Sequence, residues 1–210
     1  PEALANYLIL LGWYPGEDRD VIPLAEAVKE FSLSGMNDVQ AKFDLQKLRW
    51  LNSEYIMKMP DAELLPQVRA RLAGAGMDAT AVADDYLARV LGLYKVRLKT
   101  LSDFPAMTDC FFRDDFVLED EGKAELEKPE SREYLTALAD RLAGIEPFTH
   151  DAIEKAFRGF VEERKIKAGQ VIHPARMAVS GKTKGAGLFE MMDVLGQDRS
   201  VARLRRAAHG

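Results

Sequence analysis

Three histidines are the side chains in this 210-residue sequence that most often bind metals or transfer protons. His150, His173 and His209 lie far apart, and none is three or four residues from another histidine. His150 and His209 are expected to be exposed or helix-capping residues. His173 lies in a basic segment, where it could contact a phosphate or begin a helix. The sequence therefore predicts no metal site.

A single cysteine, Cys110, is the only thiol nucleophile, and it cannot form an internal disulfide or a multi-cysteine zinc site. The apolar residues Phe111 and Phe112 follow it, and such surroundings raise the pKa of a thiol. Acidic residues are frequent between Asp114 and Glu133, but nothing distinguishes a catalytic pair from a solvated acidic surface. No catalytic residue is predicted in this chain.

The triplet Gly181-Lys182-Thr183 matches the end of a nucleotide-binding P-loop. The earlier glycine of that motif is missing at its required spacing, and no apolar strand precedes the triplet. We therefore expect a flexible basic loop over 181–187, in which Lys182, Lys184 and exposed amides suit a phosphate or RNA surface.

Charge is distributed unevenly along the chain. The whole sequence has a net charge of −5, whereas residues 164–210 contain ten basic and three acidic side chains and carry +7. A basic C-terminal quarter on an acidic body is expected where one face meets a polyanion. Lysines and arginines on solvated helices would produce the same pattern, so both interpretations stay open.

Helical periodicity dominates the sequence, and strand patterns are nearly absent. Apolar side chains at helical spacing predict helices ending at Gly12, starting at Pro23, running through 43–51, starting at an N-cap Asp61, and covering 80–99. A turn-rich, acidic connector is expected from Phe104-Pro105 through 113–128, followed by helices that include one capped by Thr149 and one opened by Pro174. An all-α chain with two helical lobes is the resulting prediction.

The composition, 47% hydrophobic and 30% charged, is that of an ordinary globular protein and excludes collagen, rods and disordered tails. No apolar run approaches the roughly 18 residues of a membrane span, and no basic signal-peptide start is present. We therefore expect no membrane association and a cytoplasmic location. The first residue is Pro1 rather than methionine, which suggests a processed or dissected piece.

Several stretches match one family more specifically. Residues 1–13 (PEALANYLILLGW), 42–44 with 47–48, and 50–52 with Tyr55 resemble the segment after the second nucleotide-binding motif of bacterial-type glutamyl-tRNA synthetases. Arg97 with 100–101, 167–174, Arg176, 180–181, 187–190 and 195–196 are similar to the anticodon-binding region of that family. These matches cover essentially the whole chain in the family's order.

The resemblance implies a C-terminal part of such an enzyme. It implies a helical stem-contact segment over 1–60 and an anticodon-binding region whose two lobes cover 61–128 and 129–210. The parent reaction would be ATP-dependent ligation of glutamate to tRNA(Glu). ATP and magnesium would be bound by a covalently attached upstream catalytic domain, whose signatures are absent here. This chain would hold no cofactor, would be inactive alone, and is expected to be monomeric.

The family's anticodon-reading positions fall on Arg97, Arg176 and Leu188, with the loop from Gly185 to Gly187 beside them. An arginine offers a planar set of donors and can stack on an unpaired base. From the residues alone, an ion pair on a helix is the favoured interpretation of Arg97, and Arg176 could be a structural cap. The family usually has proline where this chain has Ala186.

Contacts with the RNA backbone are expected at Lys42, Lys47 and Arg49 in the stem-contact segment, and at Lys182 and Lys184 in the basic loop. Arg97 matches the position associated with the third anticodon base, which is C in glutamate tRNA and G in glutamine tRNA. Arginine there favours discrimination between the two. A stand-alone helical RNA-binding or adaptor protein and a protein-interaction scaffold remain alternative hypotheses.

Overall fold

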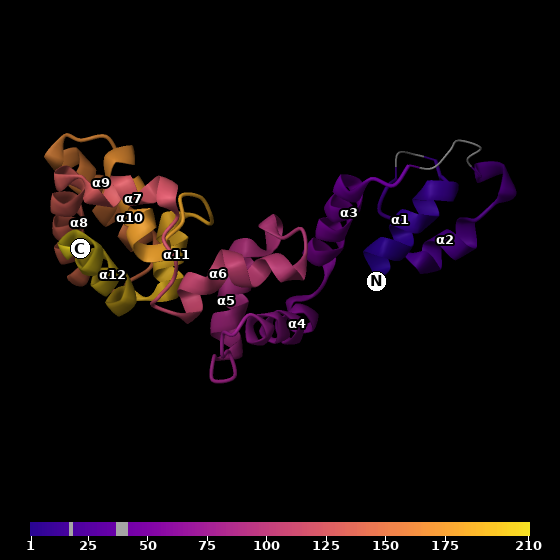
Figure 1. Ribbon diagram of the computed structural model, residues 1–210, viewed down its shortest axis with the longest axis horizontal. Coiled ribbons are helices and arrows are strands. Elements are labelled where there is room, and N and C mark those ends of the chain that lie inside the picture. The colour runs from indigo at the N-terminus through magenta and orange to yellow at the C-terminus, as the bar shows by residue number, and fades with distance from the viewer. Residues whose placement is uncertain (17–18, 37–41) are drawn as a thin grey trace.

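The computed structural model describes residues 1–16, 19–36 and 42–210 as an elongated row of helices (Figure 1). The C-terminus lies in the block at one end, and the N-terminus lies in the block at the other end, on the side that faces the middle of the molecule. In chain order these are α1 (Glu2–Gly12), α2 (Leu24–Glu30), η1 (Leu33–Gly35), α3 (Leu45–Lys58), α4 (Asp61–Gly74), α5 (Asp84–Tyr94), η2 (Lys95–Arg97), η3 (Leu101–Asp103), α6 (Phe104–Phe112), α7 (Asp120–Glu127), α8 (Pro129–Ala143), α9 (His150–Arg164), α10 (Gly169–Ser180), α11 (Leu188–Leu195) and α12 (Gln197–His209). The η elements are single 3-10 turns. The described residues contain no strand, which confirms the all-α prediction.

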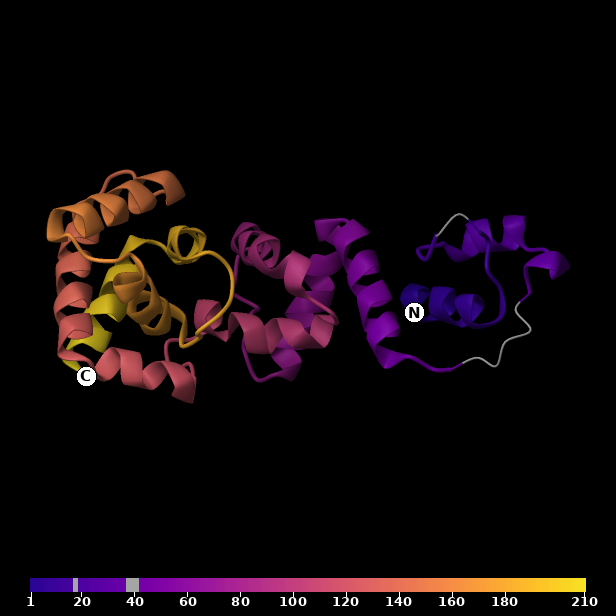
Figure 2. The ribbon, with the colours of Figure 1, turned by 90° about the horizontal axis from the view of Figure 1, so that it is seen from above.

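The helices form three successive blocks, which Figure 2 shows from above. The N-terminal block comprises α1, α2, η1 and α3, the central block α4 to α6 with η2 and η3, and the C-terminal block α7 to α12. Although α7 precedes the expected boundary at 128, it packs against α8 and α10. The division into segments at 60 and 128 stays a prediction. Within the described residues, every helix is too short or too polar to span a bilayer.

Capping decides several helix starts. The Asp44 carboxylate accepts hydrogen bonds from the backbone N–H groups of Gln46 (2.8 Å) and Lys47 (3.1 Å), so α3 begins at Leu45. Thr149 takes the predicted N-cap position of α9 but makes no side-chain capping bond. The prediction for Asp61 was wrong, because Pro60 is the N-cap of α4 and the Asp61 carboxylate instead pairs with Lys95 Nζ at 2.6 Å.

Three other boundaries differ from the expectation. The helix predicted over 80–99 is limited to α5, because residues 78–83 form turns and residues 95–97 tighten into a 3-10 turn. Phe104 and Pro105 begin α6, since proline is tolerated in a first helical turn. The expected connector contains α7, where Gly122 lets the backbone lie directly against the Met177 side chain of α10.

Proline 174 lies inside α10 rather than at its start. The helix begins five residues earlier at Gly169, and the Pro174 ring is buried. Proline lacks the N–H that would continue the ladder, so burial within the C-terminal block offsets the missing hydrogen bond. Tertiary packing here overrides a sequence signal that normally marks a helix start.

One hydrophobic core runs through the central and C-terminal blocks as far as Ala208, and Ile56 of α3 also belongs to it. A separate small cluster in the N-terminal block contains Trp13, Ile22 and Ala27. The helix that starts at Pro23 was predicted to have an apolar face of Leu24, Ala27, Val28 and Phe31. Of these only Ala27 is buried, whereas Leu24, Val28 and Phe31 are 57%, 71% and 55% exposed. The central and C-terminal blocks therefore share a core, whereas the N-terminal block leaves apolar surface uncovered.

Candidate nucleic-acid interface

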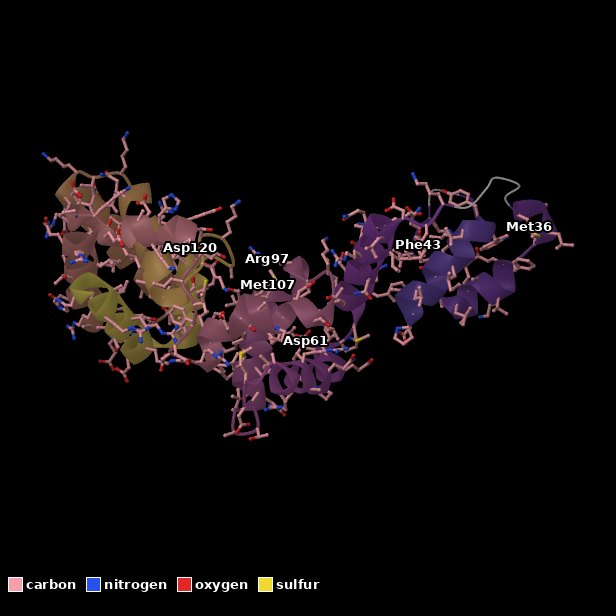
Figure 3. All side chains as sticks on the ribbon, in the orientation of Figure 1. Met36, Phe43, Asp61, Arg97, Met107 and Asp120 are labelled. Atoms are coloured by element: carbon pink, nitrogen blue, oxygen red, sulfur yellow. The ribbon has the colours of Figure 1, made fainter. Side chains whose placement is uncertain are left out.

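Arg97 and Arg176, predicted from positions 79 residues apart, are brought together where the central block meets the C-terminal block. Arg97 ends η2, directly after α5, and Arg176 projects from α10. Burial lowers the pKa of the Arg176 guanidinium, and the positive charge of Arg97 lowers it further. Figure 3 shows Arg97 at the side of the central block that faces the C-terminal helices. Two cationic side chains from different helices thus lie close enough for their charges to interact.

The two arginines differ in what holds them. Half-buried Arg176 donates through Nη1 to the Ala186 carbonyl at 2.6 Å and lies 3.7 Å from Met191 Sδ. Exposed Arg97 donates only to the Leu93 carbonyl at 2.9 Å, and it forms no ion pair in the part of the chain that the structure describes. Arg97 is therefore available to a ligand, whereas Arg176 supports the loop that begins after α10.

Tyr94 has a hydroxyl on which the charges of both arginines act, and it was not predicted as a site residue. Its side chain is 2% exposed, and burial raises the pKa of the hydroxyl well above its usual value. A Cβ added at Gly185 would lie 3.4 Å from the Tyr94 hydroxyl and 3.8 Å from Arg176 Nη1. Gly185 therefore lies close to both side chains. The signal in the sequence was a tyrosine on the buried face of α5, three residues before Arg97.

The loop over 181–187 is held by hydrogen bonds rather than left flexible. Glu119, the N-cap of α7, donates its backbone N–H to the Gly181 carbonyl at 2.8 Å. Its carboxylate accepts from the Thr183 backbone N–H (2.6 Å) and the Thr183 hydroxyl (2.7 Å), and these bonds lower the pKa of Glu119. The acidic stretch before α7 therefore contains a residue that orders the basic loop.

The predicted backbone-contact residues lie in two separate places. Lys42, Lys47 and Arg49 belong to the N-terminal block and α3, where Lys47 Nζ lies 2.7 Å from Asp20 Oδ1. Arg49 lines a groove of about 410 Å³ between α1, α3 and α4. Figure 3 shows Phe43, beside Lys42, far from Arg97 along the molecule. The structure brings Arg97, Arg176 and Gly185 together, but not with the three predicted stem-contact residues.

Residues 45–208 match the family model of the anticodon binding domain. The chain belongs to this family. It is 38% identical over 213 residues to the glutamate--tRNA ligase of Desulforudis audaxviator and 35% identical over 205 residues to glutamate--tRNA ligase 2 of Caldicellulosiruptor saccharolyticus. These matches cover 99% and 98% of the chain, but the chain spans only 42% of each relative.

Two solved structures share the fold of this anticodon-binding domain over the whole chain. They are glutamate tRNA ligases of Elizabethkingia meningosepticum, in complex with its amino acid, and Elizabethkingia anophelis. Their TM-scores are 0.89 and 0.84 at 24% and 23% sequence identity, with 41% of each of those chains covered. The comparisons confirm the resemblance to the C-terminal part of glutamyl-tRNA synthetases.

Leu188 occupies a different position in this anticodon-binding domain from that of the arginines. Its side chain is 4% exposed and belongs to the main core. As the first residue of α11, it carries one of the backbone N–H groups that have no partner within the helix. Only its backbone could meet a ligand at this end of α11, and its role in recognition stays a prediction.

Five of the ten cations in the basic C-terminal quarter of the chain form ion pairs within the protein. Acidic residues from the preceding helices and connectors provide the partners, in the pairs Arg164–Glu133, Lys182–Asp109, Arg199–Asp114, Arg203–Asp114 and Arg205–Asp140. The four acidic partners lie outside residues 164–210 and offset part of the +7 charge counted in the sequence. Lys184 and Arg97 remain exposed beside the loop.

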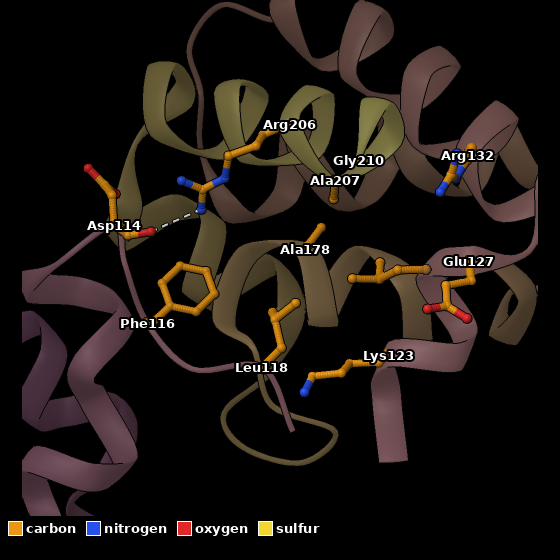
Figure 4. Close-up of a pocket in the computed structure, with 11 residues that line it drawn as sticks. Asp114, Phe116, Leu118, Lys123, Glu127, Arg132, Ala178, Arg206, Ala207 and Gly210 are labelled. Carbon is orange, nitrogen blue, oxygen red and sulfur yellow. Dashed lines mark hydrogen bonds between the residues drawn. The ribbon is translucent and has the colours of Figure 1, made fainter. Parts of the chain in front are cut away.

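The pKa of the Cys110 thiol is raised to about 12 by burial, as its apolar neighbours predicted. A pocket of about 520 Å³ lies on the anticodon-binding domain between α7, α8, α10 and α12 (Figure 4). Phe116, Leu118 and Ala178 line it, and Arg206 donates to the Asp114 carbonyl at 3.0 Å. None of the predicted site residues lines this pocket.

Proposed function

We propose that this chain binds the anticodon loop of tRNA(Glu) as the C-terminal part of a longer glutamate–tRNA ligase. The observation that carries the proposal is the meeting of Arg97 with Arg176 and Gly185 in a domain of the anticodon-binding family. RNA recognition with sequence preference depends on unstacked bases in single-stranded loops. A cationic cluster at the junction of two blocks suits such a target.

Within this proposal each residue of the site has a separate role. The exposed guanidinium of Arg97 donates hydrogen bonds to the third anticodon base, for which arginine has a rigid set of donors. Arg176 is held by the Ala186 carbonyl, and it fixes the loop next to that base. Lys184 adds an exposed positive charge for the RNA backbone. Gly185 lets this part of the loop lie close to Tyr94.

A second contact is proposed along the N-terminal block. Lys42, Lys47 and Arg49 would touch the RNA backbone nearer the acceptor stem, because the blocks follow one another in a row (Figure 1). The Lys47 charge is offset by Asp20, so Lys42 and Arg49 should contribute more. Contacts at two separate places along an elongated RNA would fix the orientation of the RNA on the protein.

The remainder of the parent enzyme is proposed to pack on the N-terminal block. The relatives are more than twice as long as this chain, and the exposed apolar side chains of α2 offer a surface for a further domain. That upstream domain would bind ATP and magnesium and carry out the ligation. We further propose that this chain alone is inactive, that the parent is monomeric, and that it works in the cytoplasm.

Direct binding tests this proposal. The isolated chain is titrated with tRNA(Glu) and with the same tRNA carrying G in place of C at the third anticodon position. We expect tighter binding of the unchanged tRNA, and no glutamate-dependent pyrophosphate exchange by the chain alone. Equal binding of the two tRNAs, or of an unrelated RNA of the same length, would contradict anticodon recognition and favour a general RNA-binding protein.

A further inference from the structure

The two lysines of the loop over 181–187 have different surroundings. Lys182 is 22% exposed, and its Nζ lies 3.7 Å from Oδ1 of Asp109, whose side chain is 16% exposed. Lys184 is exposed and forms no ion pair among the described residues. Only Lys184 therefore offers a largely unpaired charge to solvent, although the sequence placed both lysines in the same role.

The residue between these lysines is held by a carboxylate from another segment. A single oxygen of Glu119, Oε2, accepts from the Thr183 N–H at 2.6 Å and from its hydroxyl at 2.7 Å. Hydrogen bonds to an ionised carboxylate are shorter and about twice as strong as neutral ones. Because Thr183 lies between the lysines, this attachment holds the loop backbone from which both lysine side chains project.

Glycine 181 fixes the start of the same loop. It ends α10 with a φ of 70°, in the left-handed region, and a Cβ there would collide with the Val117 carbonyl and the Phe116 ring. The Glu119 backbone N–H bonds to the Gly181 carbonyl at 2.8 Å. The loop is thus attached at Gly181, at Thr183 and, through Arg176, at Ala186.

We propose that Glu119 and Asp109 are positioning residues that hold the loop over 181–187 in the conformation that presents Lys184 to RNA. This inference rests on the proposed function. Lys182 then belongs to the support of the loop, and Lys184 is the lysine that contacts phosphate. Two acidic side chains strengthen the binding of a polyanion, because a preordered loop loses less conformational entropy on binding.

A positioning role for Glu119 predicts the opposite change in RNA affinity from the one expected from charge alone. An acidic side chain beside an RNA surface repels phosphate, so long-range electrostatics predicts that neutralising it should tighten binding. If Glu119 positions the loop, its neutralisation should weaken binding instead. A Glu119→Gln variant, which changes the charge and the hydrogen bonding at almost constant volume, separates the two effects.

The test compares Glu119→Gln with Glu121→Gln, an identical change at an exposed residue of α7. We expect Glu119→Gln to raise the Kd for tRNA(Glu) roughly tenfold, equivalent to about 1.4 kcal/mol, and Glu121→Gln to leave it unchanged or slightly lower. Thermal unfolding of both variants should stay close to that of the original chain. A Glu119→Gln variant that binds as tightly as the original chain, or more tightly, would overturn the proposal.

The lysines provide an independent measurement. Lys184→Ala should reduce the slope of log K against log salt by about 0.7 to 0.9, the value for one released phosphate contact. Lys182→Ala should weaken binding with an unchanged slope, and equal slope changes for both variants would contradict the separate roles. Thr183→Ser should retain full binding and Thr183→Val should lose part of it, whereas a loss in Thr183→Ser with full binding by Thr183→Val would assign the effect to the methyl group.

Amide hydrogen exchange of the free protein distinguishes failure of this inference from failure of the proposed function. The Thr183 amide should exchange slowly in the original chain and faster in Glu119→Gln. If the original chain binds no tRNA, the proposed function is wrong and the inference fails with it. If the chain binds tRNA and the Thr183 amide exchanges equally in both proteins, the positioning role alone is wrong.

Discussion

The N-terminal and C-terminal blocks satisfy their side chains in opposite ways. The C-terminal block buries its apolar residues in a continuous core and pairs most of its cations with acidic residues. The N-terminal block has a three-residue cluster and exposes large apolar side chains, among them Leu24, Val28, Phe31 and Leu33. The C-terminal block thus covers its apolar residues within its own core, whereas the N-terminal block has an apolar surface suited to a further domain.

The largest effect is expected at Arg203, on which the C-terminal block depends. This arginine is 3% exposed and donates to the carbonyls of Val179, Cys110 and Arg113 and to the Asp114 carboxylate. Arg203→Met should lower the free energy of unfolding by about 3–5 kcal/mol, because buried acceptors lose their donor.

Arg205→Met, on the same helix, is the matched control. Arg205 is 50% exposed and pairs with Asp140 at 2.9 Å, so its replacement should change stability by less than about 0.5 kcal/mol. Urea denaturation of both variants measures the difference. Similar losses of stability in the two variants would show that buried Arg203 stabilises this block no more than exposed Arg205 does.

The second prediction concerns Arg97, at the junction of the central and C-terminal blocks. Arg97→Gln should reduce the preference for C over G at the third anticodon position by about 1–3 kcal/mol, the value of one good bidentate base contact. Overall affinity should change less, because phosphate contacts remain.

Arg71→Gln removes the same charge from an exposed position in α4 and provides the control. Binding of two tRNAs that differ only at this base measures the preference. An equal loss of affinity for both tRNAs would identify Arg97 as a general phosphate contact or a structural residue.

The third prediction concerns pH and the C-terminal block. The hydrogen bond from Arg203 lowers the pKa of the Asp114 carboxyl below its usual 3.8. Such a group stabilises the fold above its unfolded pKa, and the contribution is lost as the pH falls through the lowered folded value. Asp114→Asn should therefore cost about 1 kcal/mol at pH 7, a modest figure because Asp114 is 66% exposed.

Urea denaturation between pH 7 and pH 2.5 measures this contribution. The difference between the original chain and Asp114→Asn should shrink below about pH 4, because the carboxyl then becomes protonated in both states. A difference that stays constant over this range would show that the ion pair contributes little.

The smallest effect is expected in the N-terminal block. Val28→Ser should change the free energy of unfolding of this chain by less than about 0.5 kcal/mol, because Val28 is 71% exposed. Leu204→Ala in the C-terminal core should cost about 2–5 kcal/mol. In the longer protein Val28→Ser should become destabilising, and an unchanged stability there would argue against docking at α2.

Sequence patterns predicted the helical class because apolar spacing reports one buried face per helix. They failed where tertiary contacts compete with local preference. Asp61 has the chemistry of an N-cap, but it pairs with Lys95 from another helix. Pro174 has the chemistry of a helix start, but burial keeps it inside α10.

Some features of the candidate site could likewise be predicted from the sequence, whereas others could not. The identities of Arg97 and Arg176 and the family resemblance could be found in the sequence, because matching residues occur in a fixed order along the chain. Their proximity to Tyr94 and Gly185 required the packing of α5 against α11 and the fold of the loop. Sequence spacing cannot report such contacts, because segments about ninety residues apart meet through the packing of the helices between them.

The pairing and exposure of charged residues show most clearly which properties depended on the tertiary structure. The sequence by itself determined the all-helical class, the family and the +7 of residues 164–210. The fold decided that half of the ten cations there pair with acidic residues, that Lys182 is paired while Lys184 is exposed, and that Glu119 holds the loop between the two lysines. The physical reason is that a formal charge belongs to a residue, whereas its partners and its exposure to solvent depend on which surfaces the helices bring together.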